Sequence, residues 1–319
     1  MTHNKTIKTY ILTGFLGSGK TTLLNYLLGS ERNRLNYVVE NEFGKVSVDG
    51  SLVANNYIQL FELNNGCICC SLDGELVEVL AQLIQAEKQP DNLFIEASGV
   101  ADAGQLASIF KRDDVMKYYE LKQIICLVDA ENFEDRIEEV PEMYRQIVAA
   151  DLVLINKCDL VQQSYIENIK SIISNINPFS KIVRSEFGIF DLNILKDNSD
   201  LNFSRELVQE EIKAKPGHRM KSIAIEVPKE FEKSQLYVSL SMTIFLHYHQ
   251  IYRIKGFVKL KGEEKPVLVQ STGNKLSFKS YPEKEKNPPL MLVFIGRDIE
   301  RKGLEKILDK VTHAENISG

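Results

Sequence analysis

Eight residues near the start of the chain, 14–21, read Gly-Phe-Leu-Gly-Ser-Gly-Lys-Thr and match G-x-x-x-x-G-K-[ST] in full. A short apolar run, Tyr10–Leu12, precedes them, and leucines at helical spacing follow. Glycines let successive backbone N–H groups point inward at a phosphate, and the helix start adds its positive dipole end. This pattern predicts a nucleoside triphosphate site formed by Gly14, Gly17, Ser18, Gly19, Lys20, Thr21 and Thr22.

Four residues have expected roles in phosphate chemistry. Lys20 is expected to reach the β- and γ-phosphates, and the Thr21 hydroxyl to ligate Mg²⁺. The apolar run 92–95 ends in Glu96, which is expected to hold Mg²⁺ directly or through water. The amide of Gly99 is expected to meet the γ-phosphate. The alternative for Glu96 is a solvated strand end, and its position favours the magnesium role.

The sequence Asn156-Lys157-Cys158-Asp159 follows another apolar run and matches N-K-x-D, the guanine reader of GTPases. An aspartate accepts from both N1–H and N2–H₂ of guanine, whereas adenine offers neither donor there. Downstream of a phosphate loop, the motif favours GTP over ATP. A kinase or ligase that uses ATP is the alternative, and Asp159 argues against it.

Three cysteines, Cys67, Cys69 and Cys70, lie within four positions. Thiolates bind Zn²⁺ and Cu⁺ strongly, and a disulfide between neighbouring cysteines is strained. The cluster therefore predicts a metal site, with a redox site as the alternative.

Carboxylates end the predicted second strand, in the segment Glu40-Asn41-Glu42-Phe43-Gly44. Glu40 and Glu42 are candidates for holding a metal or Mg²⁺, or for positioning the attacking water. From spacing alone, an ordinary acidic loop is an equally fair reading.

The order of the elements predicts two domains. Apolar runs alternate with helical patterns up to residue 184, which is typical of an α/β P-loop domain with a mostly parallel sheet. Residues 186–215 are polar and poorly periodic, and we expect a linker there. Hairpin-joined strands and two helices after it predict a smaller α+β domain with an antiparallel sheet. The expected domains are residues 1–215, linker included, and 216–319.

Composition limits the classes of partner. The chain has 319 residues, 44% of them hydrophobic and 26% charged, as in a globular protein. A net charge of −5 does not favour nucleic acid, and no apolar run is long enough for a membrane. We therefore expect a cytoplasmic protein with no nucleic-acid or membrane partner.

Taken together, these motifs resemble the CobW family of P-loop GTPases, whose members are often called zinc metallochaperones. In the second domain, residues 253–257 (Arg-Ile-Lys-Gly-Phe) and 294–296 (Phe-Ile-Gly) resemble the family's carboxyl-terminal domain. The resemblance implies binding of GTP or GDP with Mg²⁺ and slow GTP hydrolysis, with Lys20, Thr21, Glu42 and Glu96 in the catalytic site.

The resemblance also implies Zn²⁺, or Co²⁺ or Ni²⁺, bound by the three clustered cysteines and Glu40 and delivered to a client metalloprotein. One departure is Lys45, where the family commonly has glutamate, because a protonated lysine cannot ligate a metal. A non-catalytic metal sensor or store that uses GTP only as a conformational ligand is the alternative.

Four further residues are expected to have no chemical role. His247 and His249 are candidates for auxiliary metal ligands, but we favour ordinary surface positions for them. Cys126 and Cys158 lie on or beside predicted strands and are expected to be small packing residues.

Overall fold

The computed structural model describes residues 6–40, 59–62, 72–86, 88–195, 220–247, 250–272, 275–280 and 288–313. These residues fall into two compact units. The first runs to Ile173 and resumes at Ser180, and the second comprises Ser174–Phe179 and the described residues from Met220 onward.

The first unit is built on a seven-stranded sheet in the order β3-β2-β4-β1-β5-β6-β7, and every pairing in it is parallel. The middle residues of most of its strands are apolar, as expected where both faces of a sheet are covered. They are β1 (Ile7–Gly14), β2 (Asn36–Glu40), β3 (Gln59–Glu62), β4 (Asn92–Glu96), β5 (Tyr119–Asp129), β6 (Leu152–Asn156) and β7 (Lys181–Arg184).

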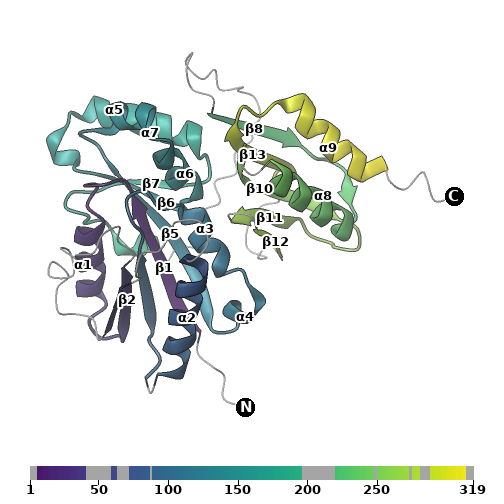
Figure 1. The fold of residues 1–319 in the computed structure, drawn as a ribbon. Helices are drawn as coiled ribbons and strands as arrows, with labels where there is room; N and C mark the ends of the chain where they lie inside the picture. The colour runs from purple at the N-terminus through teal and green to yellow at the C-terminus, as the bar shows by residue number, and fades with distance from the viewer. Residues whose placement is uncertain are drawn as a thin grey trace. The chain divides into compact units, whose positions relative to one another are not determined.

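Helices cover both faces of this sheet (Figure 1). Leucines of α1 pack with Leu12, Phe94 and Leu127 on one face, and α2 and α3 pack with Ile11 and Ile95 on the other. Because side chains alternate along a strand, neighbouring residues of β1 serve opposite faces. The helices are α1 (Lys20–Ser30), α2 (Leu72–Gln85), α3 (Ala103–Ile109), α4 (Asp113–Met116), α5 (Phe133–Glu139), α6 (Pro141–Ala149) and α7 (Gln163–Ile176).

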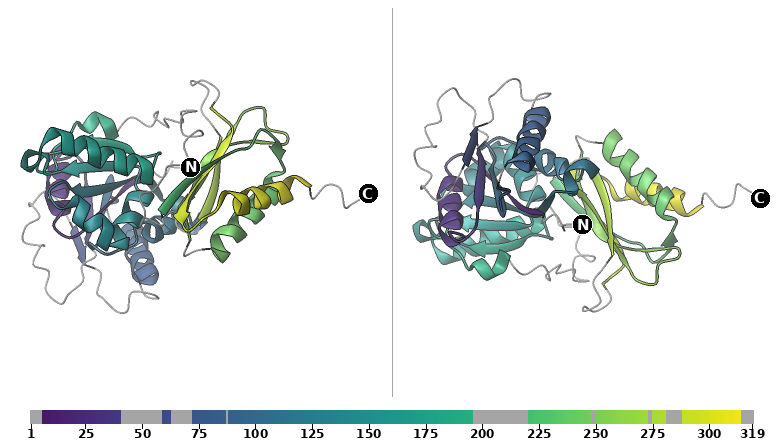
Figure 2. Two further views of the ribbon diagram at one scale, coloured as in Figure 1. Left: turned by 90° about the horizontal axis from the view of Figure 1, so that it is seen from above. Right: turned by 90° about the horizontal axis from the view of Figure 1, so that it is seen from below.

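The second unit is a sheet in the order β12-β11-β10-β13-β8 with antiparallel pairings, to which the short β9 adds a parallel pair with β10. Figure 2 shows α8 and α9 side by side on one face of this sheet. The elements are β8 (Met220–Glu226), β9 (Glu230–Phe231), α8 (Lys233–Leu246), β10 (Ile251–Leu260), β11 (Val267–Thr272), β12 (Lys275–Ser280), β13 (Met291–Arg297) and α9 (Arg301–His313).

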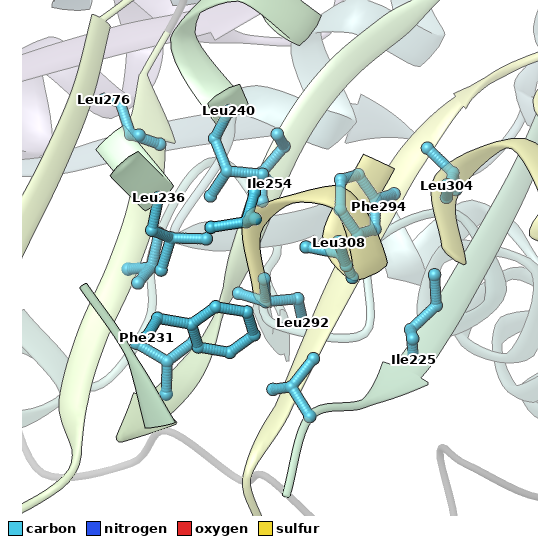
Figure 3. Close-up of a cluster of buried hydrophobic side chains, with 14 of the residues drawn as sticks. Ile225, Phe231, Leu236, Leu240, Ile254, Leu276, Leu292, Phe294, Leu304 and Leu308 are labelled. Atoms are coloured by element: carbon cyan, nitrogen blue, oxygen red, sulfur yellow. The ribbon is translucent and has the colours of Figure 1, made fainter. Parts of the chain in front are cut away.

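The core of the second unit lies between the two helices and the sheet. Leu236 and Leu240 of α8 and Leu304 and Leu308 of α9 meet Ile254, Leu292 and Phe294 from the strands (Figure 3). The two motifs that resemble the family's carboxyl-terminal domain are neighbours, since Ile254 of β10 pairs with Phe294 of β13.

The predicted fold class, a P-loop α/β domain followed by an antiparallel α+β domain, is confirmed. β3 was not predicted.

The prediction that a linker begins at residue 186 is wrong for residues 186–195. Phe190 is buried against α1 in the core of the first unit, and Leu192–Leu195 forms a 3-10 helix beside it. Only a few apolar residues anchor this segment, too few to give a periodic pattern. The expected boundary between residues 215 and 216 lies outside the described residues.

Among the helices in the described ranges, none has the length and apolar character needed to cross a membrane.

Candidate functional site

Three predicted site residues and Asp129 end four strands at one edge of the parallel sheet, two strands on each side of β1. Glu40 of β2 pairs with Glu96 of β4, and Asp129 of β5 pairs with Asn156 of β6. Residues two positions earlier on these strands pack against α1, so these four side chains lie on the α1 side of the sheet. Phosphate loop, carboxylates and N-K-x-D motif therefore share one edge and one face, where α/β sheets bind ligands.

The phosphate loop folds tightly against β5. Gly14 has φ +142°, and a Cβ there would lie 2.3 Å from the Leu127 carbonyl oxygen, so only glycine fits. Lys20 is buried, and its Nζ donates to the carbonyl oxygens of Gly14 (3.0 Å) and Phe15 (3.3 Å). The loop thus encloses the ammonium group that is expected to meet the phosphates.

Thr21 and Glu96, predicted to share Mg²⁺, lie together. The Thr21 hydroxyl donates to Glu96 Oε1 at 2.9 Å. Glu40, the register neighbour of Glu96, is 4% exposed. Hydroxyl and carboxylate oxygens are the hard ligands that Mg²⁺ prefers, so the donor set fits this ion.

Asn156 is a structural bridge within the site. Its Nδ2 donates to the Ser18 carbonyl oxygen of the phosphate loop at 2.9 Å. Its Oδ1 accepts from the Gly188 N–H at 3.0 Å and from the Ser185 hydroxyl at 3.2 Å. The side chain is buried with these bonds made, so it ties the phosphate loop to the 185–189 turn.

Lys157 is held by an aspartate that sequence reasoning missed. Its Nζ donates to Asp129 Oδ2 at 2.8 Å, and Asn132 Nδ2 donates to the same oxygen at 3.0 Å. Burial raises the pKa of Asp129, but these hydrogen bonds outweigh it, so the net pKa lies below its usual value. The sequence pattern that predicted Glu96 could also have predicted Asp129, because both residues directly follow an apolar run.

Replacing Asp129 by asparagine is expected to destabilise the chain by about 1.5–3 kcal/mol at neutral pH, since Lys157 loses a charged partner. A lowered folded pKa stabilises the fold above the ordinary aspartate pKa of about 4, and this stabilisation is lost as pH falls through the lowered value. Thermal unfolding of both proteins from pH about 7 to about 3 checks that the difference shrinks in acid. A difference independent of pH would contradict this account.

Arg136 makes a second contact with the phosphate loop that was not predicted from the sequence. Arg136 of α5 donates to the Leu16 carbonyl oxygen at 3.4 Å, and its guanidinium lies 5.0 Å from the centre of the Phe15 ring. On the other side, a Cβ on Gly99 would lie 2.9 Å from the Leu16 backbone nitrogen. Gly99 therefore lies directly against the loop, where its amide was predicted to act.

Some of the remaining predicted residues lie within the described part of the chain, and others lie outside it. Asp159 and Thr22 are exposed at the site edge, and Gly17 and Gly19 have positive φ angles of 75° and 100°. The metal candidates Cys67, Cys69 and Cys70, the catalytic candidate Glu42, and Lys45 and His249 lie outside the described residues. Within the described ranges, no cluster of three or more metal-binding side chains occurs.

Two cysteines and one histidine fit their expected structural roles. Cys126 and Cys158 are buried, and burial raises the pKa of the Cys126 thiol to about 12. His247 is exposed, with its Nδ1 3.0 Å from Gln250 Oε1.

A parallel sheet whose first strand leads into a phosphate loop, with N-K-x-D at the end of β6, defines a P-loop GTPase fold. Family models support this class. The nucleotide-binding domain of CobW/HypB/UreG matches residues 8–184, and the cobalamin synthesis protein cobW C-terminal domain matches residues 220–312. The chain belongs to the CobW/HypB/UreG family.

Relatives match over nearly the whole chain. The zinc chaperone YjiA of Escherichia coli is 30% identical over 90% of this chain and 92% of its own length. The zinc chaperone CobW of Pseudomonas aeruginosa is 28% identical over 92% of this chain and 88% of its own length. The crystal structure of Zn(II)-bound YjiA GTPase from E. coli has a TM-score of 0.70 at 26% identity, covering 96% of this chain and 99% of that one.

Proposed function

We propose that the protein binds and slowly hydrolyses GTP, and that it binds zinc, or another transition metal such as Co²⁺ or Ni²⁺, and delivers it to a client protein. The observation that carries this proposal is the register of β2 and β4. Glu40, the carboxylate proposed for the transition metal, is the direct neighbour of Glu96, which holds the Thr21 hydroxyl. One strand spacing of about 4.8 Å separates the backbones of Glu40 and Glu96.

In the nucleotide half, the phosphate loop and Lys20 bind the phosphates, and Asp159 reads the guanine edge. Mg²⁺ held by Thr21 and Glu96 would neutralise charge on the β- and γ-phosphates. Lys20 stabilises the charge that develops on the leaving and transferred groups. Glu42 follows Glu40 by two residues and is proposed to act on the attacking water. The named zinc-bound GTPase relative supports this half of the proposal.

In the metal half, thiolates of Cys67, Cys69 and Cys70 bind the cargo ion together with Glu40. Three thiolates and one carboxylate form a four-ligand set suited to Zn²⁺. The zinc chaperones among the relatives support zinc as the ion. Lys45 contributes no ligand, so Glu40 carries more of the carboxylate role here.

Adjacent sites predict that the two affinities are linked. A non-hydrolysable GTP analogue and GDP should give Zn²⁺ affinities that differ by about 5- to 150-fold, because binding at one site changes the other reciprocally. Titration of Zn²⁺ in each nucleotide state, and of nucleotide with and without Zn²⁺, measures both sides of the linkage.

Replacing Cys69 and Cys70 by serine should abolish the difference and leave nucleotide binding intact. Cys126→Ala is the matched control, because the buried Cys126 thiol stays protonated at neutral pH and should not bind metal. Equal Zn²⁺ affinity in both nucleotide states would refute the coupled mechanism.

A further inference from the structure

Phe187 has a backbone conformation that a bulky residue rarely adopts. Its φ is +53°, the following Gly188 has φ +70°, and the Ile189 N–H donates to the Glu186 carbonyl oxygen at 2.9 Å. Two consecutive positive φ angles define a tight turn whose central positions favour Asn, Asp and Gly. A phenylalanine there costs conformational free energy.

Burial does not offset this cost. The Phe187 side chain is 68% exposed, whereas Phe190, three residues later, is 7% exposed within the core. Neither turn preference nor core packing therefore accounts for an aromatic residue at this position. Strained residues that the surrounding structure holds in place are typical of ligand-binding sites.

The turn is fixed to the elements that form the nucleotide site. A Cβ on Gly188 would lie 3.0 Å from the Leu23 backbone, so the turn lies directly against the first turn of α1. The Gly188 N–H donates to Asn156 Oδ1, and the Tyr26 hydroxyl donates to the Phe190 carbonyl oxygen. These contacts hold the turn that carries Phe187 in place.

The position of the turn indicates which part of a bound nucleotide lies near the Phe187 ring. The phosphate loop contacts the Nδ2 side of the Asn156 amide, and the turn contacts its Oδ1 side. Phe187 lines a groove together with Cys158, the third residue of N-K-x-D, and with Gln163 and Ile166 of α7. Because Asp159 directly follows Cys158, a nucleotide with its guanine edge at Asp159 would have its base close to this turn.

We propose that Phe187 stacks on the guanine base of the bound nucleotide. This inference rests on the proposed GTP binding and adds a base-contacting residue to it. Every base has a π-face, so stacking adds affinity without distinguishing GTP from GDP. Selection of guanine stays with Asp159, and the phosphates stay with the loop.

Phe187→Asn is the informative variant, because asparagine tolerates the left-handed backbone and removes the ring. The dissociation constants of GTP and GDP should both rise about 10-fold, the usual scale for one aromatic–base stack, with their ratio unchanged. Inorganic tripolyphosphate, which lacks the base, should bind both proteins equally in competition with a fluorescent GTP analogue. Phe187→Tyr should retain wild-type affinity.

Met116→Asn is the control, because it removes another exposed apolar side chain, 52% exposed, from α4 of the same unit and should leave all affinities unchanged. The nucleotide-free Phe187→Asn protein should unfold at a temperature no lower than the wild type. Wild-type GTP affinity in Phe187→Asn, or a parallel loss of tripolyphosphate binding, would overturn the stacking role. A wild-type chain that binds neither GTP nor GDP would overturn the proposed function instead.

Discussion

Replacing Lys20 by alanine is expected to reduce GTP hydrolysis by about 100-fold or more and to weaken GTP binding. The physical reason is the position of the ammonium group. It is buried within the phosphate loop, bonded to the carbonyl oxygens of Gly14 and Phe15, and is expected to move to the phosphates when they arrive. Steady-state phosphate release and the dissociation constant of a GTP analogue measure the two effects.

Because Lys20 is buried, the alanine variant also leaves a space in the loop. Lys20→Met keeps most of the side-chain volume without the charge and should lose hydrolysis equally. Lys122→Ala, which removes a surface ion pair with Glu120, is the control and should hydrolyse GTP at the wild-type rate. Wild-type turnover in Lys20→Met would refute the assignment of the phosphate loop.

Asp159→Asn is expected to weaken GTP binding by about 10- to 100-fold and to reduce the preference for GTP over ATP. Two carboxylate acceptors become one acceptor and one donor, and the donor opposes the N–H edge of guanine. Asp159 is exposed in the 3-10 helix that follows β6, Cys158–Leu160, so its acceptors are available to a ligand. Competition between GTP and ATP in both proteins measures the change in preference.

Asp113→Asn is the control for this variant, because it changes an exposed aspartate on α4 in the same unit. Tripolyphosphate should bind Asp159→Asn as it binds the wild type. Unchanged discrimination between GTP and ATP would mean that the guanine base is read elsewhere.

The sequence determined the chain's class and the edge of the sheet at which its motifs lie. Residues 14–21 have a backbone requirement that few sequences satisfy, and the strands before Glu40, Glu96 and Asn156 are continuously apolar because both faces of the sheet are buried. A parallel sheet brings the ends of such strands to one edge, so short local patterns sufficed. The short strand β3 and residues 186–195 lacked such a pattern, and neither was predicted from the sequence.

Only the tertiary structure decided which residues work together across the site. Strand order makes Glu40 the neighbour of Glu96, and neither sequence distance nor motif contains that order. Asn156 was predicted to contact the nucleotide, yet its buried amide bonds Ser18 and Gly188, which lie far from it in the chain. Phe187 was identified as a candidate base-contacting residue from its φ angle and its exposure. Its backbone strain results from the packing of the turn against α1, which the sequence does not reveal. Local sequence patterns reflect the backbone conformation of a single segment. Contacts between distant segments depend instead on the order of the strands in the sheet.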